Sequence, residues 1–179
     1  MIRYEDRVKM LSNLLSEEEL QPLVNYMIDN GFLTAPASTK YHGAYEGGLF
    51  DHSFQVATQL INLTLTQSLQ WQKSRSPKLV GIAHDLCKID AYVCTKGEGR
   101  QQFTYNPHIT DRRHGEKSVD IIKKIVPDLT EEEELCIKFH MGFTIPKTEW
   151  DGYRDAIKKY NNVLWTHQAD MIASVIHDI

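Results

Sequence analysis

The sequence predicts a mostly α-helical fold that carries one small β-hairpin. Apolar residues recur at helical spacing along most of the chain, and helix-capping and helix-stopping residues divide it into segments. One short stretch near the middle changes to alternating β-forming residues instead. The 179 residues are 41% hydrophobic and 25% charged, as in ordinary globular domains. We therefore expect residues 1–179 to form a single domain.

The N-terminal half is expected to form four helices and one long loop. Ser16, followed by three glutamates, has the form of an N-cap with an acidic first turn. Asn30-Gly31 is a typical helix stop, and the loop 34–48 that follows contains a proline and three glycines. Ser76-Pro77 offers an N-cap with proline at the first helical position. The expected helices span residues 4–15, 16–29, 49–72 and 76–88.

The second half begins with the hairpin, at about residues 91–105. Tyr92–Thr95 and Gln102–Tyr105 have strand-forming residues, and the glycine-containing segment 96–100 separates them. Thr130 followed by Glu133 has the pattern of a capping box. The expected helices of this half span about residues 113–126, 130–140, 149–159 and 162–177.

The charge and the cysteines limit the classes of partner. A net charge of −4 argues against an extended duplex nucleic-acid surface, although bound metal would add local positive charge for a nucleotide or a short oligonucleotide. The three cysteines give no disulfide framework, and the N-terminus has no signal-peptide pattern, so we expect a cytoplasmic protein. No apolar run approaches the roughly 20 residues that span a bilayer, so we expect no membrane partner.

A set of histidines and aspartates predicts a metal site. A single histidine in a helix is more often a surface or core residue than a ligand, and an isolated His-Asp pair is common by chance. A set of six such residues is less easily explained by chance, because each lies in or at the end of a helical segment with apolar neighbours. Imidazole and carboxylate groups are ligands for divalent transition metals. The candidate ligands are His52, His84, Asp85, His114, His140 and Asp170.

The spacing around His84-Asp85 adds two conditions. Adjacent side chains diverge by about 100° on a regular helix, so both reach one ion only if the helix ends there or the carboxylate reaches around. Lys88 follows Asp85 by three residues and lies on the same side. An ammonium group beside a metal pocket would repel the metal unless an anion lies between them, and phosphate is the obvious anion.

These residues carry a resemblance to a known family. His52, His84-Asp85 and Asp170 resemble the H…HD…D signature of the HD superfamily of metal-dependent phosphohydrolases. The segment 84–89 is similar to the HD-x-x-K-I form of its two-metal branches. His114 and His140 match the positions of the histidines that hold a second metal there, whereas Met141 stands where those branches often have another histidine.

The stretches 35–37 and 42–49 before His52 most resemble the HD domain of bacterial 3′→5′ exoribonucleases. The resemblance covers about residues 35–173 and implies an HD-type helical bundle. Those exoribonucleases also carry an N-terminal oligonucleotide-binding barrel for which this chain has no room, so we expect a nucleotide or a short oligonucleotide rather than long RNA as the substrate.

The resemblance implies metal-assisted hydrolysis of a phosphomonoester or phosphodiester. His52, His84, Asp85 and Asp170 would hold one ion, and Asp85 would bridge to a second ion held by His114 and His140. The metal lowers the pKa of bound water to give a nucleophile, and Lys88 would pair with the phosphoryl oxygens. This ligand set suits one or two ions of Mn, Fe, Ni, Co or Zn.

Some assignments have open alternatives. His42 and Tyr45, in the glycine-rich loop, are candidates for binding the leaving group or base, although Tyr45 could pack on a helix and His42 could be solvated. His167 is either a residue that orients a ligand or a core histidine. A cyclic-nucleotide or cyclic-dinucleotide phosphodiesterase is less favoured, because the GYP-type signature of cyclic-di-GMP enzymes is absent. The alternative from another class is a non-catalytic metal- or nucleotide-binding module. The sequence leaves the oligomeric state open.

Overall fold

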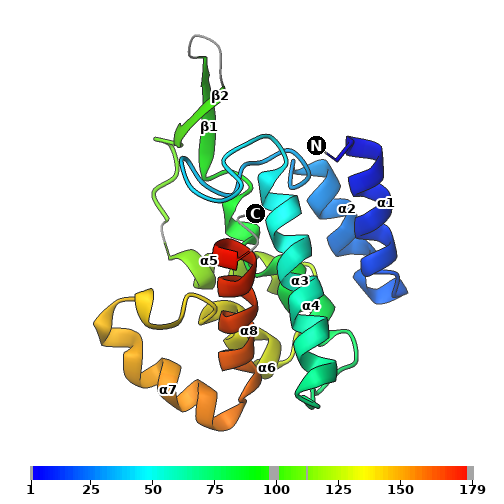
Figure 1. Ribbon diagram of the computed structural model, residues 1–179, viewed down its shortest axis with the longest axis vertical. Helices are drawn as coiled ribbons and strands as arrows, with labels where there is room; N and C mark the ends of the chain where they lie inside the picture. Colours follow the sequence, from blue (N-terminus) through cyan, green and yellow to red (C-terminus); the bar gives the residue numbers. More distant parts are fainter. Residues whose placement is uncertain (1, 97–100, 112, 177–179) are drawn as a thin grey trace.

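The described part of the computed structural model contains eight α-helices and one antiparallel pair of strands (Figure 1). The structure describes residues 2–96, 101–111 and 113–176. The helices are α1 (Tyr4–Leu14), α2 (Gln21–Asp29), α3 (Gly48–Thr66), α4 (Ser76–Ala83), α5 (His114–Lys123), α6 (Glu131–Lys138), α7 (Trp150–Lys159) and α8 (Asn162–Met171). The strands are β1 (Tyr92–Lys96) and β2 (Gln101–Tyr105). The prediction of a mostly α fold with one small hairpin is confirmed.

Several predicted boundaries were wrong. The expected helix 49–72 ends at Thr66, because Ser68 has a positive φ of 51° and the chain turns back, with the Trp71 Nε1–H donating to Thr64 Oγ1 at 2.9 Å. The glutamates after Ser16 fall in a 3-10 turn, Glu18–Leu20, and α2 begins only at Gln21.

Other predicted helices were also too long. The helix expected to reach residue 88 ends at Ala83 and continues as the 3-10 turn Leu86–Lys88. The helix expected over 113–126 ends at Lys123, and the last helix changes into the π-helical turn Ile172–Ile176. The hairpin turn expected at 96–100 and the end of the last helix at residue 177 extend outside the described residues.

Helix α3 is the centre of the packing. It packs against α4 and α8, and α6 packs against α5 and α8 (Figure 1). All eight helices contribute side chains to one connected core, whose burial from water is the main source of stability. Its fully buried members include Val56, Ala57 and Leu60 of α3, Leu79, Val80 and Ile82 of α4, and Ile137 of α6.

The predicted capping box begins α6 and also ties this helix to α4. Thr130 Oγ1 accepts a bond from the Glu133 backbone N–H at 3.2 Å, and Glu133 Oε2 accepts one from the Thr130 N–H at 2.8 Å. The other oxygen of the fully buried Glu133 accepts a bond from the Ser76 hydroxyl at 2.9 Å. Arg75, also buried, lies beside this carboxylate with its Nε 3.5 Å from Oε1. A buried carboxylate is tolerated here because donors surround it.

Two expectations from composition can be compared with the structure. Cys87, Cys94 and Cys136 are all free thiols. Within the described residues, no helix combines the length and the apolar character needed to cross a membrane.

Candidate metal centre

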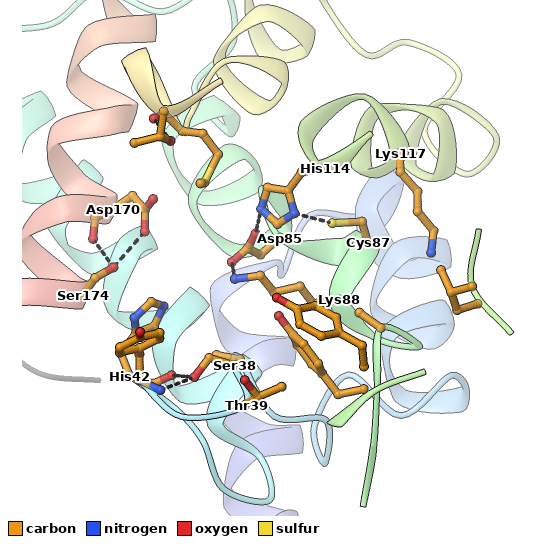
Figure 2. Close-up of a pocket in the computed structure, with 18 of the residues that line it drawn as sticks. Ser38, Thr39, His42, Asp85, Cys87, Lys88, His114, Lys117, Asp170 and Ser174 are labelled. Atoms are coloured by element: carbon orange, nitrogen blue, oxygen red, sulfur yellow. Dashed lines mark hydrogen bonds and ion pairs between the residues drawn. The ribbon is translucent and has the colours of Figure 1, made fainter. Parts of the chain in front are cut away.

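The structure brings all six predicted ligands together in one cluster. Figure 2 shows three of them, Asp85, His114 and Asp170, at the pocket that adjoins the cluster. His52 lies in the second turn of α3, and Asp170 lies near the end of α8. His114 is the first residue of α5. The other three follow helix ends, with His84 and Asp85 directly after α4 and His140 two residues after α6. The end of α4 at Ala83 fulfils the condition that lets His84 and Asp85 face the same site.

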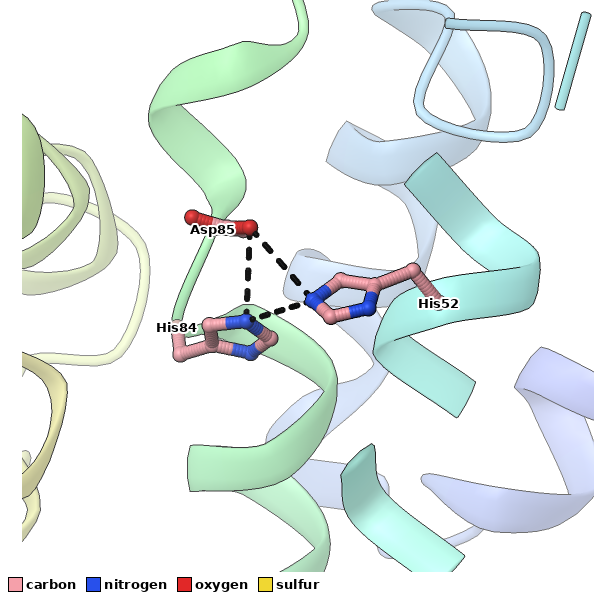
Figure 3. Close-up of side chains that lie close together, drawn as sticks. All are labelled: His52, His84 and Asp85. Carbon is pink, nitrogen blue, oxygen red and sulfur yellow. Dashed lines mark hydrogen bonds and ion pairs between the residues drawn. The ribbon is translucent and has the colours of Figure 1, made fainter. Parts of the chain in front are cut away.

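The first group consists of His52, His84 and Asp85 (Figure 3). The two Nε2 atoms lie 3.3 Å apart, and Asp85 Oδ2 lies 3.7 Å from His52 Nε2 and 3.4 Å from His84 Nε2. Asp170 Oδ1 adds a second carboxylate oxygen 3.2 Å from His52 Nε2. The three members of the group are at most 2% exposed.

The second group shares Asp85 with the first. Asp85 Oδ1 lies 2.8 Å from His114 Nε2 and 3.5 Å from His140 Nε2. The two oxygens of one carboxylate therefore face two different pairs of imidazoles. His84, His140 and Asp170 form a further group, whose potential ligand atoms also lie within 4.8 Å of one another. The three groups share residues and therefore form one continuous cluster.

Backbone carbonyls fix the orientation of two of the imidazoles. His84 Nδ1 lies 2.8 Å from the Gly81 carbonyl oxygen, and His140 Nδ1 lies 2.7 Å from that of Ile137. A carbonyl oxygen only accepts, so each Nδ1 must carry the proton. In its neutral form, each ring then presents the lone pair of Nε2 to the cluster, as metal-ligating histidines do.

Three buried atoms of the cluster lack a hydrogen-bond partner within the described part of the chain. They are Asp85 Oδ1, His114 Nε2 and His140 Nε2. The approach of His114 to Asp85 at 2.8 Å is an ion-pair contact without the direction of a hydrogen bond. Buried polar atoms are nearly always satisfied, so three converging exceptions require an explanation. A divalent cation would satisfy all three, and this donor set could hold one.

The electrostatics favour the ligand forms of the carboxylates. Burial alone would raise the pKa of Asp85, but Lys88, His84 and His114 hold it well below its ordinary value. Burial likewise opposes charge on Asp170, and its hydrogen bond with His52 and the nearby His84 and His140 hold its pKa below the ordinary range. Burial lowers the pKa of His84. The site therefore contains two ionised carboxylates beside a neutral imidazole, as metal binding requires.

Lys88 lies beside the Asp85 carboxylate, as predicted from the sequence. Its Nζ is 2.7 Å from Asp85 Oδ2, and its side chain is 14% exposed. Burial opposes the charge, but Asp85 more than offsets it, so the pKa of Lys88 is above its ordinary value. The lysine is therefore a fixed ammonium group at the edge of the cluster.

The cluster opens into a cavity of about 940 Å³ (Figure 2). His42 lines it, and the ring of His42 lies 4.9 Å from that of His52. Tyr45 is not among the lining residues. Its hydroxyl donates to Asp51 Oδ2 at 3.0 Å, and Asp51 pairs with Arg7 at the same distance. Burial and Asp51 raise the pKa of Tyr45 to about 12, which is typical of a structural tyrosine.

Some residues at the cavity were not singled out as substrate-binding residues by the sequence analysis. His167 lines it, and the His167 Nδ1–H donates to the backbone oxygen of His140 at 2.8 Å, so it orients the segment that carries a candidate ligand. Tyr92 and Tyr105 line the cavity from the hairpin. Tyr92 begins the first predicted strand and Tyr105 ends the second, so the predicted hairpin already places the two tyrosines opposite each other. Ser38 and Met141 line it too, from loops that carry no such pattern.

Gly81 permits the close crossing of α3 and α4 that brings His52 to His84. A Cβ at this position would overlap the backbone of Ala57. We expect Gly81→Ala to destabilise the protein by about 1–3 kcal/mol and to weaken metal binding roughly 10–100-fold without changing a ligand. Metal titration and urea unfolding measure the two effects.

Gly152→Ala is the matched control for this prediction, because the nearest atom to a Cβ there is Phe139 Cζ at an ordinary 3.5 Å. Its metal affinity should equal that of the wild type. Equal metal affinity in Gly81→Ala would show that the crossing does not set the distance between the ligands.

All six predicted metal ligands thus meet in one cluster. Asp85, His114 and Asp170 of this cluster line the cavity with Lys88 and His42, whereas Tyr45 does not line it. The site combines a bridging position for a carboxylate, buried imidazoles and one ammonium group. No family model, curated protein or solved structure matches this chain.

Proposed function

We propose that this protein is a metal-dependent phosphohydrolase of HD type that acts on a nucleotide or a short oligonucleotide. One observation carries the proposal. The two oxygens of Asp85 face two sets of imidazoles, while the Lys88 ammonium lies 2.7 Å from Oδ2. A site built only to store metal has no use for a buried cation beside the ligands. A phosphoryl group would lie between this ammonium and the metal and would be attracted by both.

The ligand geometry supports one or two ions of Mn, Fe, Ni, Co or Zn. His52, His84, Asp85 and Asp170 would hold the first ion, and Asp85, His114 and His140 the second. Met141 lies at the cavity and adds no imidazole to the second set, so we expect weaker binding there. Bound metal supplies a nucleophile by lowering the pKa of coordinated water and offsets charge on the reacting phosphate.

The side chains of the chain itself orient the substrate. Lys88 would transfer its interaction from Asp85 to a phosphoryl oxygen and would stabilise the charge that builds there during the reaction. His42 lines the cavity beside His52, where it would contact the leaving group. The burial of His52, His84 and Asp85 confines access to the cavity side.

Lys88→Met separates metal binding from turnover. We expect the variant to retain its metal or to bind it more tightly, because a repelling charge is removed. The rate of phosphoester hydrolysis should fall roughly 100-fold or more, since a charged group aimed at the reacting phosphate is lost. Metal content by mass spectrometry and hydrolysis of nucleotides and dinucleotides, with each candidate metal added, give the two readouts.

Lys123→Met is the control, because Lys123 is exposed on α5 and pairs with Glu134 at 2.8 Å. It should behave as the wild type in both assays. Wild-type protein that holds metal and hydrolyses no phosphoester would favour the non-catalytic module instead.

A further inference from the structure

The cavity above the metal centre has two chemically different parts. Near the cluster it is lined by charged or metal-binding groups, among them Lys88, His114 and Asp170 (Figure 2). Toward the hairpin the lining is aromatic, with Tyr92 and Tyr105. A volume of about 940 Å³ lies at the upper end for organic ligands and greatly exceeds the size of a phosphate group. The cavity therefore has room for a ligand that extends beyond a phosphate group into the aromatic part.

Tyr92 and Tyr105 form a pair on one face of the hairpin. They are directly opposite in the register of β1 and β2, and their ring centroids lie 5.4 Å apart. Aromatic pairs of this kind contribute modestly to hairpin stability wherever they occur. Here the pair also lines the cavity, and Tyr105 remains 63% exposed. An exposed aromatic surface at the wall of a cavity suits a planar ligand, since bases stack on such rings.

The hairpin is tied firmly to the metal centre. The 3-10 turn Leu86–Lys88 connects Asp85 to the start of β1 within a few residues. The Asn106 backbone N–H donates to the Ala91 carbonyl at 2.9 Å, which closes the base of the hairpin. Lys117 of α5 bonds to Asp90 at 2.7 Å and anchors the same base to a second element. The aromatic pair is thus held at a fixed place relative to Lys88.

We propose that Tyr92 and Tyr105 form a stacking subsite for the nucleobase of the ligand whose phosphate binds at Lys88. The identity of this phosphate as the reacting group rests on the proposed function, whereas stacking can be measured by binding alone. A nucleotide has the required combination, an anionic group joined through a sugar to a planar aromatic ring. The charged floor and the aromatic wall match these two ends.

The test compares equilibrium binding of adenosine 5′-monophosphate and ribose 5-phosphate, which lacks the base, to the full chain loaded with Mn²⁺. Each ligand is used as its phosphonate analogue, which the protein could not hydrolyse. We expect the nucleotide to bind roughly 10-fold or more tightly, which is the usual worth of one stacked base. Tyr105→Ala should remove most of this difference and leave ribose 5-phosphate unchanged. Tyr105→Phe keeps the ring and should bind both ligands as the wild type does.

Val93→Ala is the matched control for damage to the hairpin. Val93 adjoins Tyr92 in β1, so its side chain points to the opposite face, and it pairs with Thr104. This variant should keep the wild-type preference for the nucleotide. Equal binding of the two ligands by the wild type, or wild-type nucleotide affinity in Tyr105→Ala, would overturn the proposal. Phenyl phosphate binding as tightly as the nucleotide would overturn the assignment to a nucleobase.

The outcomes separate this subsite from the proposed activity. Nucleotide binding that depends on Tyr105, in a protein that hydrolyses no phosphoester, would support the subsite and contradict the phosphohydrolase. Equally efficient hydrolysis of substrates with and without a base, unaffected by Tyr105→Ala, would support the phosphohydrolase and contradict the subsite.

Discussion

Asp85→Asn is expected to reduce bound metal to background and to abolish phosphoester hydrolysis. Asp85 contributes to both ligand groups, with Oδ2 facing His52 and His84 and Oδ1 facing His114 and His140. The substitution keeps the shape of the side chain but removes its charge. The Lys88 ammonium, whose Nζ lies 2.7 Å from Asp85 Oδ2, would then lose its ion-pair partner and would repel a cation. Metal content and phosphate release, measured on the same preparation, test this expectation.

Two histidine variants make the result specific. His114 belongs only to the second group, so His114→Ala should lose at most one of two ions and keep the ion at His52 and His84. His108 is exposed, and His108→Ala should retain full metal content. An unchanged amount of tightly bound metal in Asp85→Asn would contradict the bridging position of this carboxylate. Far-UV circular dichroism confirms that each variant is folded before its metal is counted.

Local signals predicted the elements that position the site better than they predicted where those elements end. The capping box at Thr130 and Glu133 is a contact within one turn, so the sequence displays it directly. The end of α4 at Ala83 has no glycine or proline to mark it, although the convergence of His84 and Asp85 depends on it. Ser68, whose positive φ accompanies the end of α3, is not a residue type that signals such a turn.

Contacts between residues far apart in the sequence determine which of the predicted substrate-binding residues lie at the cavity. Tyr45 was placed at the cavity because it shares a glycine-rich loop with His42. The structure turns its hydroxyl to Asp51, whose charge is paired with Arg7. Asp51 and Arg7 lie 44 positions apart, so no local pattern could show this pair. Tyr92 and Tyr105 are the opposite case. The hairpin that carries them was predicted, but their position at the cavity depends on where the fold places this hairpin.

Arg75→Leu is expected to lower the free energy of unfolding by about 3–5 kcal/mol, the usual cost of removing one partner of a buried ion pair. The Arg75 side chain is 2% exposed, and its Nε faces the fully buried Glu133 at 3.5 Å. Its other nitrogens contact Glu19 at 2.5 Å and Asp128 at 3.0 Å. Those two carboxylates are about half exposed, so the uncompensated charge on Glu133 accounts for most of the cost. Urea unfolding at neutral pH measures the loss.

A second substitution identifies the source of this loss. Arg75→Leu combined with Glu133→Gln should recover part of the stability, because the amide removes the buried charge and keeps acceptor oxygen for Ser76 or Thr130. Arg154→Ala, which breaks an exposed pair with Asp151, should change stability by less than about 0.5 kcal/mol. A double variant no more stable than Arg75→Leu would show that packing, not charge, makes Arg75 necessary.

The pH dependence of the Arg75→Leu effect follows from Asp128. Hydrogen bonds from Lys73 and Arg75 lower the pKa of Asp128 to about 2 from an ordinary 3.8. A carboxylate whose folded pKa is depressed stabilises the fold above its unfolded pKa and loses this contribution as the pH falls toward the folded value. The difference in stability between the wild type and Arg75→Leu should therefore narrow between about pH 4 and pH 2. This narrowing should be small compared with the stability lost through the buried charge on Glu133. The Asp128 side chain is 54% exposed, so solvent screens its ion pairs.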